Sequence, residues 1–245
     1  HVSGSAAGKS TIDYGNFAEF NGNAPDAKIA FFDIGGPDSN INIPSDLDLD
    51  LLQPLYDAGA RVFTNSWGLL VVDGSGNYFP SRNAYTSHSR SVDKFMLRNP
   101  DALVFFSAGN FGDMRDGNTV SAPSTNKNGV CVGASLNHND AFKSLLGTDA
   151  AKSSFNENGV AFFSSEGPTQ DNRLKPDVMA PGYPMYSVAA HQDCGVKALQ
   201  GTSMASPTAA GIAVLVRDYF VSGFYPSGRR KESDGFTPSG ALLKA

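Results

Sequence analysis

The stretch that decides the fold is Gly-Thr-Ser-Met-Ala-Ser-Pro at residues 201–207, followed by the small and apolar run Ala-Ala-Gly-Ile-Ala-Val-Leu-Val at residues 209–216. The Gly-Thr pair predicts a turn that delivers Ser203 to the first turn of a helix, where free backbone N–H groups and the helix dipole favour negative charge. Pro207 is expected in that first turn, where its missing N–H costs nothing. Because the side chains that follow are small, we expect the helix to be buried against other backbone.

Composition limits the classes of function. The chain has 245 residues, of which 40% are hydrophobic and 18% charged, so it suits one large globular domain with a substantial core. Its net charge of -5 offers no electrostatic footprint for nucleic acid or an anionic membrane. The one basic cluster, residues 229–231, is followed by acidic residues and indicates a solvated loop. No apolar run is long enough to span a bilayer.

Two cysteines, Cys131 and Cys194, are too few for a disulfide scaffold and lack the spacing of a zinc site. Cys131 lies in the apolar run 129–133, where a buried free thiol is the favoured state. A bridge between the two cysteines is the alternative.

Four short runs rich in valine, isoleucine and phenylalanine read as strands buried on both faces of a parallel sheet: residues 28–34, 61–66, 103–108 and 129–135. A helix is predicted between the first two, beginning at Ser45 and closing at Gly59, with acidic residues in its first turn and leucines on one face. A second helix is expected near residues 91–98, where Pro100 stops it. This alternation predicts an α/β fold with a doubly wound, mostly parallel sheet flanked by helices.

Ligands in such sheets bind beyond the carboxyl ends of the strands. Two of those ends, Asn-Ser-Trp-Gly at 65–68 and Ser-Ala-Gly-Asn at 107–110, are polar and glycine-rich, as expected of loops that approach a substrate backbone. A phosphate loop at residues 74–79 is excluded because its third glycine is missing and no helix pattern follows it. The alternating aspartates at 46, 48 and 50 lack the glycine and spacing of an EF-hand calcium loop.

Five separated motifs, taken together, resemble the subtilisin-like serine proteases, the subtilases, in the order that family has them. The motifs lie at residues 1–8, 64–68, 106–110, 164–182 and 201–205. The first resembles the end of the family's His-Gly-Thr-His-Val-Ala-Gly segment. The others resemble its substrate-binding strand, its oxyanion asparagine, its Gly-Pro and Lys-Pro-Asp segments and its nucleophile. The resemblance covers almost the whole chain.

The resemblance implies acyl transfer with Ser203 as nucleophile and Asn110 as a side-chain donor to the oxyanion, beside the backbone N–H of Ser203. From the residues alone, Ser203 could be only a helix N-cap and Asn110 only a turn asparagine. An α/β-hydrolase esterase is excluded because Ala205 stands where its elbow needs glycine.

The family's substrate-binding positions map onto two further segments. Ser66, Trp67 and Gly68 would pair with an extended substrate as an added strand, with Trp67 walling an apolar subsite; a core role for Trp67 is the alternative. The other substrate-binding positions are Ser107, Ala108, Gly109 and Ser121. Ser121 is expected near the floor of the specificity pocket, beside a cis Ala122–Pro123 bond.

The histidine is where this sequence departs from the family pattern. His1 corresponds to the second histidine of the motif, so the catalytic one is expected three residues before His1, with the orienting aspartate further upstream. His88, His138 and His191 lie in polar surroundings, read as exposed, and match no catalytic position. We therefore expect residues 1–245 to form part of a catalytic domain that lacks the histidine segment and the N-terminal strand. A helix pattern that begins at residue 237 stops without a terminating signal, so we expect the C-terminal helix to be truncated.

Two functions remain from these observations: a serine endopeptidase present as its nucleophile-bearing part, or a catalytically inactive peptide-binding pseudoprotease. The resemblance implies a peptide or protein substrate, a monomer, and a secreted or extracellular location. The charge and the absence of a long apolar run predict no nucleic-acid or membrane partner. It also allows structural calcium, although no ligand cluster can be carried over by residue and no cofactor or metal-binding residue is assigned.

Overall fold

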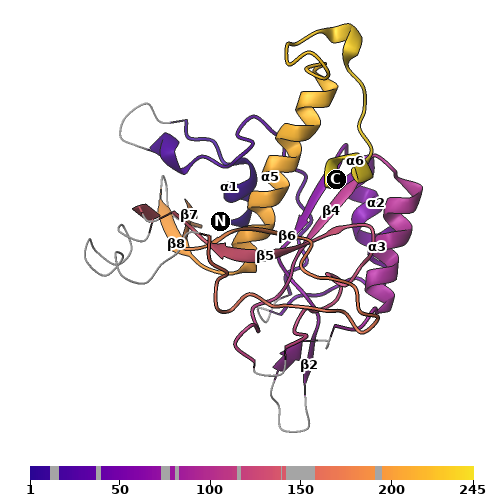
Figure 1. Ribbon diagram of the computed structural model, residues 1–245, viewed down its shortest axis with the longest axis vertical. Coiled ribbons are helices and arrows are strands. Elements are labelled where there is room, and N and C mark those ends of the chain that lie inside the picture. Colours follow the sequence, from indigo (N-terminus) through magenta and orange to yellow (C-terminus); the bar gives the residue numbers. More distant parts are fainter. Residues whose placement is uncertain are drawn as a thin grey trace.

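A computed structural model describes residues 1–11, 17–36, 40–72, 78–80, 83–114, 117–138, 140–141, 158–190 and 195–245 (Figure 1). The helical elements are α1 (Val2–Ala7), η1 (Phe17–Phe20), η2 (Asp48–Leu52), α2 (Gln53–Asp57), α3 (Ser87–Arg98), α5 (Thr202–Val221), η3 (Glu232–Asp234) and α6 (Gly240–Lys244). The strands are β1 (Val62–Asn65), β2 (Leu70–Val72), β3 (Tyr78–Pro80), β4 (Leu103–Ser107), β5 (Val130–Leu136), β6 (Val178–Tyr183), β7 (Met185–Val188) and β8 (Val196–Leu199).

The centre of the fold is a four-stranded sheet in the order β1-β4-β5-β6, in which every pair of neighbours is parallel. Three of the predicted strands are confirmed, because β1, β4 and β5 lie within one residue of the expected runs at 61–66, 103–108 and 129–135. All five residues of β4 are buried, as a strand covered on both faces requires. Two antiparallel hairpins, β2-β3 and β7-β8, complete the strands.

The fourth predicted strand, residues 28–34, is wrong for this structure. The segment forms no ladder, and the one bridge nearby joins Gly35 to Ile41. Ile29 is 53% exposed and Phe31 75% exposed. The composition of the segment suits a buried strand, but a strand also needs a neighbour for its N–H and C=O groups and covering layers for its side chains. Among the described residues, only Ile34 at the end of the segment has either: its carbonyl accepts from the Asn42 N–H at 2.6 Å and its side chain packs against the core.

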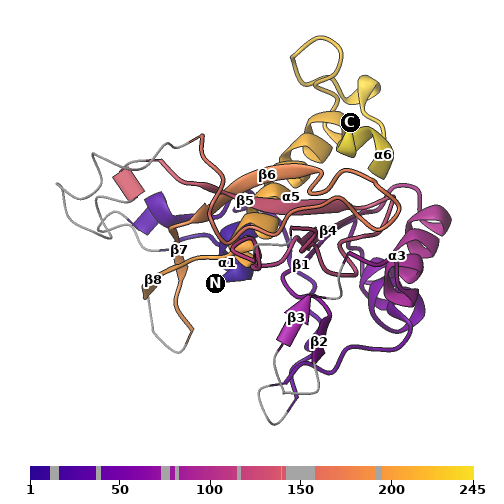
Figure 2. The same cartoon turned by 60° about the horizontal axis from the view of Figure 1, so that its bottom comes forward.

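Helices cover both faces of the sheet. Successive side chains of a strand point to opposite faces. In β1, the Phe63 ring packs edge-on against Phe95 of α3, with ring centroids 5.3 Å apart, whereas the Thr64 hydroxyl lies 3.1 Å from that of Ser206 in α5. Therefore α3 and α5 lie on opposite faces, and both views show the strands between them (Figures 1 and 2). The predicted doubly wound α/β architecture is confirmed.

The two predicted helices are present with different starts. The first is helical from Leu47 through η2 and α2, and Asp46, rather than Ser45, caps it by accepting a hydrogen bond from the Asp48 backbone N–H at 3.0 Å. It closes at Gly59, whose φ of +102° favours glycine. The second, α3, begins four residues before the expected 91–98, with Thr86 as its N-cap.

Helix α5 is the long central helix, and it differs from the expectation in two respects. Because it begins at Thr202, Pro207 falls in its second turn rather than its first. Its N-terminal half is buried, but Ile212 is 51% exposed and Leu215 50% exposed, so the small-residue run does not bury the whole helix. None of the helices in the described part of the chain is long and apolar enough to cross a membrane.

Cys131 is a free thiol on β5, and it is fully buried. Burial raises its pKa to about 11. The alternative of a bridge from Cys131 is therefore wrong in this structure; Cys194 lies outside the described residues.

Candidate active site

The structure brings Ser66, Asn110 and Ser203 together at the carboxyl edge of the sheet. Ser66 follows β1, Asn110 lies in the loop after β4, and Ser203 is in the first turn of α5. The Ser66 hydroxyl donates to the Ser203 carbonyl at 2.7 Å, and the Ser203 hydroxyl donates to the Ser66 carbonyl at 3.4 Å. Asn110 contacts the residue before Ser203, because its Oδ1 accepts from the Thr202 N–H at 2.9 Å.

Pro207 explains why Ser66 can make the shorter of these bonds. In an α-helix the carbonyl of residue 203 would accept from the N–H of residue 207, and proline has none. The Ser203 carbonyl is therefore left for another donor, and the Ser66 hydroxyl takes that place. This bond ties the first turn of α5 to the end of β1.

The Asn110 amide is held in one orientation by Thr202. Its Oδ1 accepts from both the N–H and the hydroxyl of Thr202, each at 2.9 Å, and the Thr202 hydroxyl accepts from the Gly109 N–H at 3.2 Å. Thr202 is fully buried. With Oδ1 occupied, the Nδ2 group of Asn110 is the end of the amide that remains to donate to a ligand.

Two N–H donors line the space beside Gly201. An ideal Cβ built on Gly201 would lie 3.5 Å from Asn110 Nδ2, 3.6 Å from Asn110 Oδ1 and 3.6 Å from the Ser203 backbone nitrogen. Gly201 has a φ of +141°, which side-chain-bearing residues rarely adopt. Oδ1 is already occupied by Thr202, so a small anion would bind on the Nδ2 side of this point, within reach of Nδ2 and the Ser203 N–H and at the positive end of the α5 dipole.

Ser121 lies between two glycines of the predicted substrate segments. Its hydroxyl would be 2.6 Å from an ideal Cβ on Gly68 and 3.6 Å from one on Gly109, so a side chain at position 68 would collide with it. Ser121 is 2% exposed, and the Ala122–Pro123 bond is cis, as predicted. The hydroxyl therefore packs where the two loops meet, deep behind Gly68.

The other predicted substrate-binding residues divide into buried and accessible positions. Ser107 is 6% exposed and Ala108 fully buried, so their side chains belong to the protein interior. Trp67 is half-buried and packs edge-on against Phe106 at 5.2 Å between ring centroids, which gives it part of the core role that was the alternative. The main-chain groups of Trp67 and Gly68 have no hydrogen bond to another described residue, so they remain available to an extended ligand.

None of the described histidines is within hydrogen-bond reach of the Ser203 hydroxyl. His1 uses its Nε2 on the carbonyls of Met185 and Lys197, at 3.2 and 3.0 Å, in the hairpin β7-β8. His88 is a half-buried residue of α3 rather than an exposed loop residue, and this corrects the expectation. His138 is exposed as predicted, and His191 lies outside the described residues.

The described residues contain no group of three or more His, Cys, Asp or Glu side chains that could hold a metal ion. The structure therefore assigns no ligands to structural calcium. Sequence reasoning also missed Thr202, which it treated only as part of the turn. The available signal was its position between Gly201 and Ser203, where a hydroxyl can reach a neighbouring loop.

Comparison with known proteins agrees with the motif pattern. The sequence profile of the subtilase family matches residues 1–228. Over its full length the chain is 32% identical to the serine protease/ABC transporter B family protein tagD and 30% identical to tagB, both from Dictyostelium discoideum. The chain spans only 17% and 16% of these two relatives. Serine protease AprX from Bacillus subtilis is 32% identical over 46% of this chain, which is 25% of AprX.

Solved structures share the fold. The self-cleaved protease domain of PatA superposes with a TM-score of 0.63 and 22% identity, covering 100% of this chain and 71% of that one. The CspB protease of Clostridium perfringens gives a TM-score of 0.66 and 16% identity, covering 99% of this chain and 72% of that one. At these identities the likeness establishes the architecture and not the activity.

Proposed function

The chain belongs to the subtilase family, and we propose that it is the nucleophile-bearing part of a serine endopeptidase catalytic domain. Ser203 is the proposed nucleophile. Asn110 Nδ2 and the Ser203 N–H are the proposed donors to the oxyanion of the tetrahedral intermediate. The observation that carries the proposal is the placement of these two donors around one point beside Gly201, next to a serine at a helix N-terminus.

The chemistry follows from that placement. Attack by the Ser203 oxygen on a peptide carbonyl would move negative charge onto the carbonyl oxygen. Two fixed N–H donors stabilise that charge without having to reorganise, because the Thr202 bonds hold the Asn110 amide in place. The main-chain groups of Trp67 and Gly68 would align the substrate as an added strand, which brings its carbonyl to Ser203.

We further propose that the general base is the residue three positions before His1. His1, the N-cap residue of α1, is anchored on the β7-β8 hairpin, which leads into α5. Further along α1, Ala6 lies against Gly211, whose ideal Cβ would be 2.8 Å from the Ala6 carbonyl. The two helices therefore run in the same direction. Eight residues before Gly211 is Ser203, and eight residues before Ala6 is the proposed base. In helical geometry both steps span about 12 Å, so the base would be level with Ser203.

Three proteins test this assignment: residues 1–245, the protein with its native upstream segment, and the latter with Ser203→Ala. Peptide hydrolysis and labelling by a serine-directed phosphonate are measured on each. We expect labelling and turnover in the upstream-containing protein, their loss in Ser203→Ala, and little activity from residues 1–245, because serine is a poor nucleophile without a base. Circular dichroism checks that each protein is folded.

A folded upstream-containing protein that neither hydrolyses peptides nor reacts with the phosphonate would instead be a peptide-binding pseudoprotease. Turnover by residues 1–245 equal to that of the longer protein would refute the assignment of the upstream base. We also propose an extracellular location and a monomeric state from the family resemblance. Fractionation of the native host and light scattering of the purified protein test these two points.

A further inference from the structure

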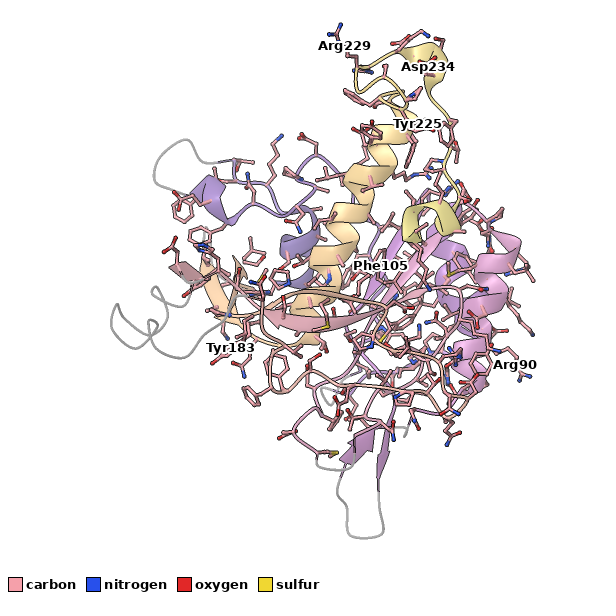
Figure 3. All side chains as sticks on the ribbon, viewed as in Figure 1. Arg90, Phe105, Tyr183, Tyr225, Arg229 and Asp234 are labelled. Atoms are coloured by element: carbon pink, nitrogen blue, oxygen red, sulfur yellow. The ribbon has the colours of Figure 1, made fainter. Side chains whose placement is uncertain are left out.

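Strand β1 is an edge of the central sheet. It pairs with β4 on one side, and no strand within the described residues pairs with its other side. Phe105 of β4 lies opposite Thr64 in this ladder and marks the sheet among the side chains (Figure 3). Phe63 packs against α3 and Thr64 contacts α5, so the free edge lies between the two helical layers. Such an edge is a template on which another strand can pair.

The alternation of the main chain shows which groups of β1 point away from β4. The Arg61 carbonyl accepts from the first N–H of β4 at 2.8 Å, so the main-chain groups of residue 61 face β4. Every second residue repeats this direction, so those of Phe63 and Asn65 also face β4. The groups of Val62 and Thr64 therefore face the free edge, where they have no hydrogen-bond partner in the described part of the chain.

Residues 28–34 are a second strand-like segment whose main chain is unpaired. The N–H and C=O groups of residues 28–33 make no hydrogen bond to another described residue. Ile29 is 53% exposed and Phe31 is 75% exposed, although the composition of the segment suits a buried strand. The segment therefore lacks both an edge to pair with and a layer to cover its side chains.

The connections of the chain place this segment relative to β1. The chain passes from residues 28–34 to β1 through η2 and α2, and from β1 to β4 through α3. Tyr56 of α2 packs edge-on against Phe95 of α3, with 6.0 Å between ring centroids, so both connections lie on one face of the sheet. Right-handed crossovers on one face all proceed in the same direction along a sheet. As a parallel strand, residues 28–34 would thus lie beyond β1, on the side away from β4.

We propose that the free edge of β1 and residues 28–34 form a docking site for one β-strand of the chain upstream of His1, and that a separate polypeptide carrying that strand also binds there. This inference rests on the upstream segment of the proposed function. The two surfaces follow each other in the sheet order but do not pair, so one strand fits between them. The PatA and CspB chains extend beyond the part that this chain covers, which leaves length for such a strand.

The site determines the chemistry of its occupant. Helices cover β1 on both faces, so a strand beside it should be a nearly continuous apolar run of about 4–8 residues. Strand β4 and the helices α3 and α5, which hold β1 in place, all belong to residues 1–245. The edge is therefore formed before the strand binds, and this is why the occupant need not be covalently attached.

Hydrogen exchange of single amides in residues 1–245 tests the proposal. The Ser203→Ala protein is measured alone, with the native upstream segment added as a separate polypeptide, and with that segment attached. We expect the N–H groups of Val62 and Thr64 to exchange at least about 10-fold more slowly in both complexes, because they gain hydrogen bonds to the docked strand. The N–H groups of Phe63 and Asn65 already face β4, so they should change less and serve as internal controls.

Two substitutions separate docking from general association. Phe31→Asp places a charge where the docked strand would bury it, so the added segment should bind at least about 10-fold more weakly. Leu174→Asp is the matched control, because Leu174 is similarly exposed, at 89%, and lies before β6, at the opposite edge of the sheet. It should leave binding unchanged. Both positions are exposed, so both variants should fold, which circular dichroism checks.

Four results would overturn the proposal. Unchanged exchange at Val62 and Thr64 in the protein with the segment attached would show that no strand docks at this edge. Equal slowing at all four amides of β1 would show general stabilisation instead. Protection by a higher concentration of residues 1–245 alone would make a second copy the occupant, and protection only with the segment attached would exclude binding of a separate polypeptide.

The exchange pattern is independent of protease activity, because it is measured without the Ser203 hydroxyl. A longer protein that shows the protection but has no activity in its Ser203 form would contradict the proposed function and leave the docking site intact. A longer protein that is active but shows no protection would contradict the docking site alone.

Discussion

The Ser66 hydroxyl should stabilise the protein through the Ser203 carbonyl, because Pro207 cannot supply the helical N–H. Ser66→Ala removes the donor at 2.7 Å and leaves a part-buried carbonyl without a partner. Leaving such a group unsatisfied costs about 1–3 kcal/mol, and the lower half of that range applies because the bond is only part-buried. We therefore expect Ser66→Ala to lower the free energy of unfolding by about 1–2 kcal/mol.

A double-mutant cycle isolates this mechanism. In a Pro207→Ala background, the N–H of residue 207 returns and can donate to the Ser203 carbonyl along the helix. Removal of the Ser66 hydroxyl then leaves no unsatisfied acceptor. We expect Ser66→Ala to cost at least about 0.5 kcal/mol less in that background than in the wild type, which is a measurable coupling for residues in contact.

Urea unfolding of residues 1–245, followed by far-UV circular dichroism, measures all four corners of the cycle. Ser222→Ala is the matched control, because that serine is also half-buried at an end of α5, but its hydroxyl bonds only to the exposed side chain of Asp218 and satisfies no backbone carbonyl. It should change the free energy of unfolding by less than about 0.5 kcal/mol. If Ser66→Ala costs the same with and without Pro207, the account of the Ser203 carbonyl is refuted.

Four further predictions concern the site and the titrating groups. In the protein with its upstream segment, Asn110→Ala should lower kcat by about 10²–10³ with a smaller change in KM, a magnitude known for such a donor in another subtilase. Thr202→Val should also lower kcat, whereas Thr202→Ser should retain it, because only the serine keeps the hydroxyl bond to the amide; kinetics that do not distinguish the two variants would contradict the positioning role. In a Cys194→Ser background, iodoacetamide should label Cys131 at least about 100-fold more slowly in the folded than in the urea-unfolded protein at pH 8, because burial raises the pKa of its thiol to about 11. Burial and, next, a hydrogen bond to the Asp93 carboxylate raise the pKa of Tyr85 to about 12. The stability that neutral Tyr85 contributes is therefore complete below about pH 10 and is lost as the pH rises through 12. Over this pH range, the urea midpoint of Tyr85→Phe should fall less steeply than that of the wild type.

The parts of the fold predicted from the sequence are those whose signal is local. β4 and β5 are continuous apolar runs, and their burial needs no knowledge of the rest of the chain. The segment 28–34 has the same composition and is exposed, because pairing depends on which strands lie beside it. β6 was missed for the opposite reason. It contains Pro181 and Gly182, residues that weaken a strand pattern, and its pairing with β5 places it in the sheet.

In the candidate site, the sequence predicted which residues take part but not how they are hydrogen-bonded. The family resemblance identified Ser203 from the motif at residues 201–205 and Asn110 from the separate motif at residues 106–110. It could not show that the Thr202 N–H and hydroxyl would both donate to the Oδ1 atom of Asn110. That arrangement depends on the distance between the β4 loop and the start of α5, which only the packed sheet determines.

Pro207 links the local structure of helix α5 to its contact with the end of strand β1. Placed in the second turn, Pro207 frees the one carbonyl that belongs to the proposed nucleophile, and a residue from the end of β1 takes it. Thr202 meanwhile binds the loop after β4. Three hydrogen bonds of 2.7–2.9 Å thus hold the first turn of α5: one from Ser66, after β1, and two to Asn110, after β4.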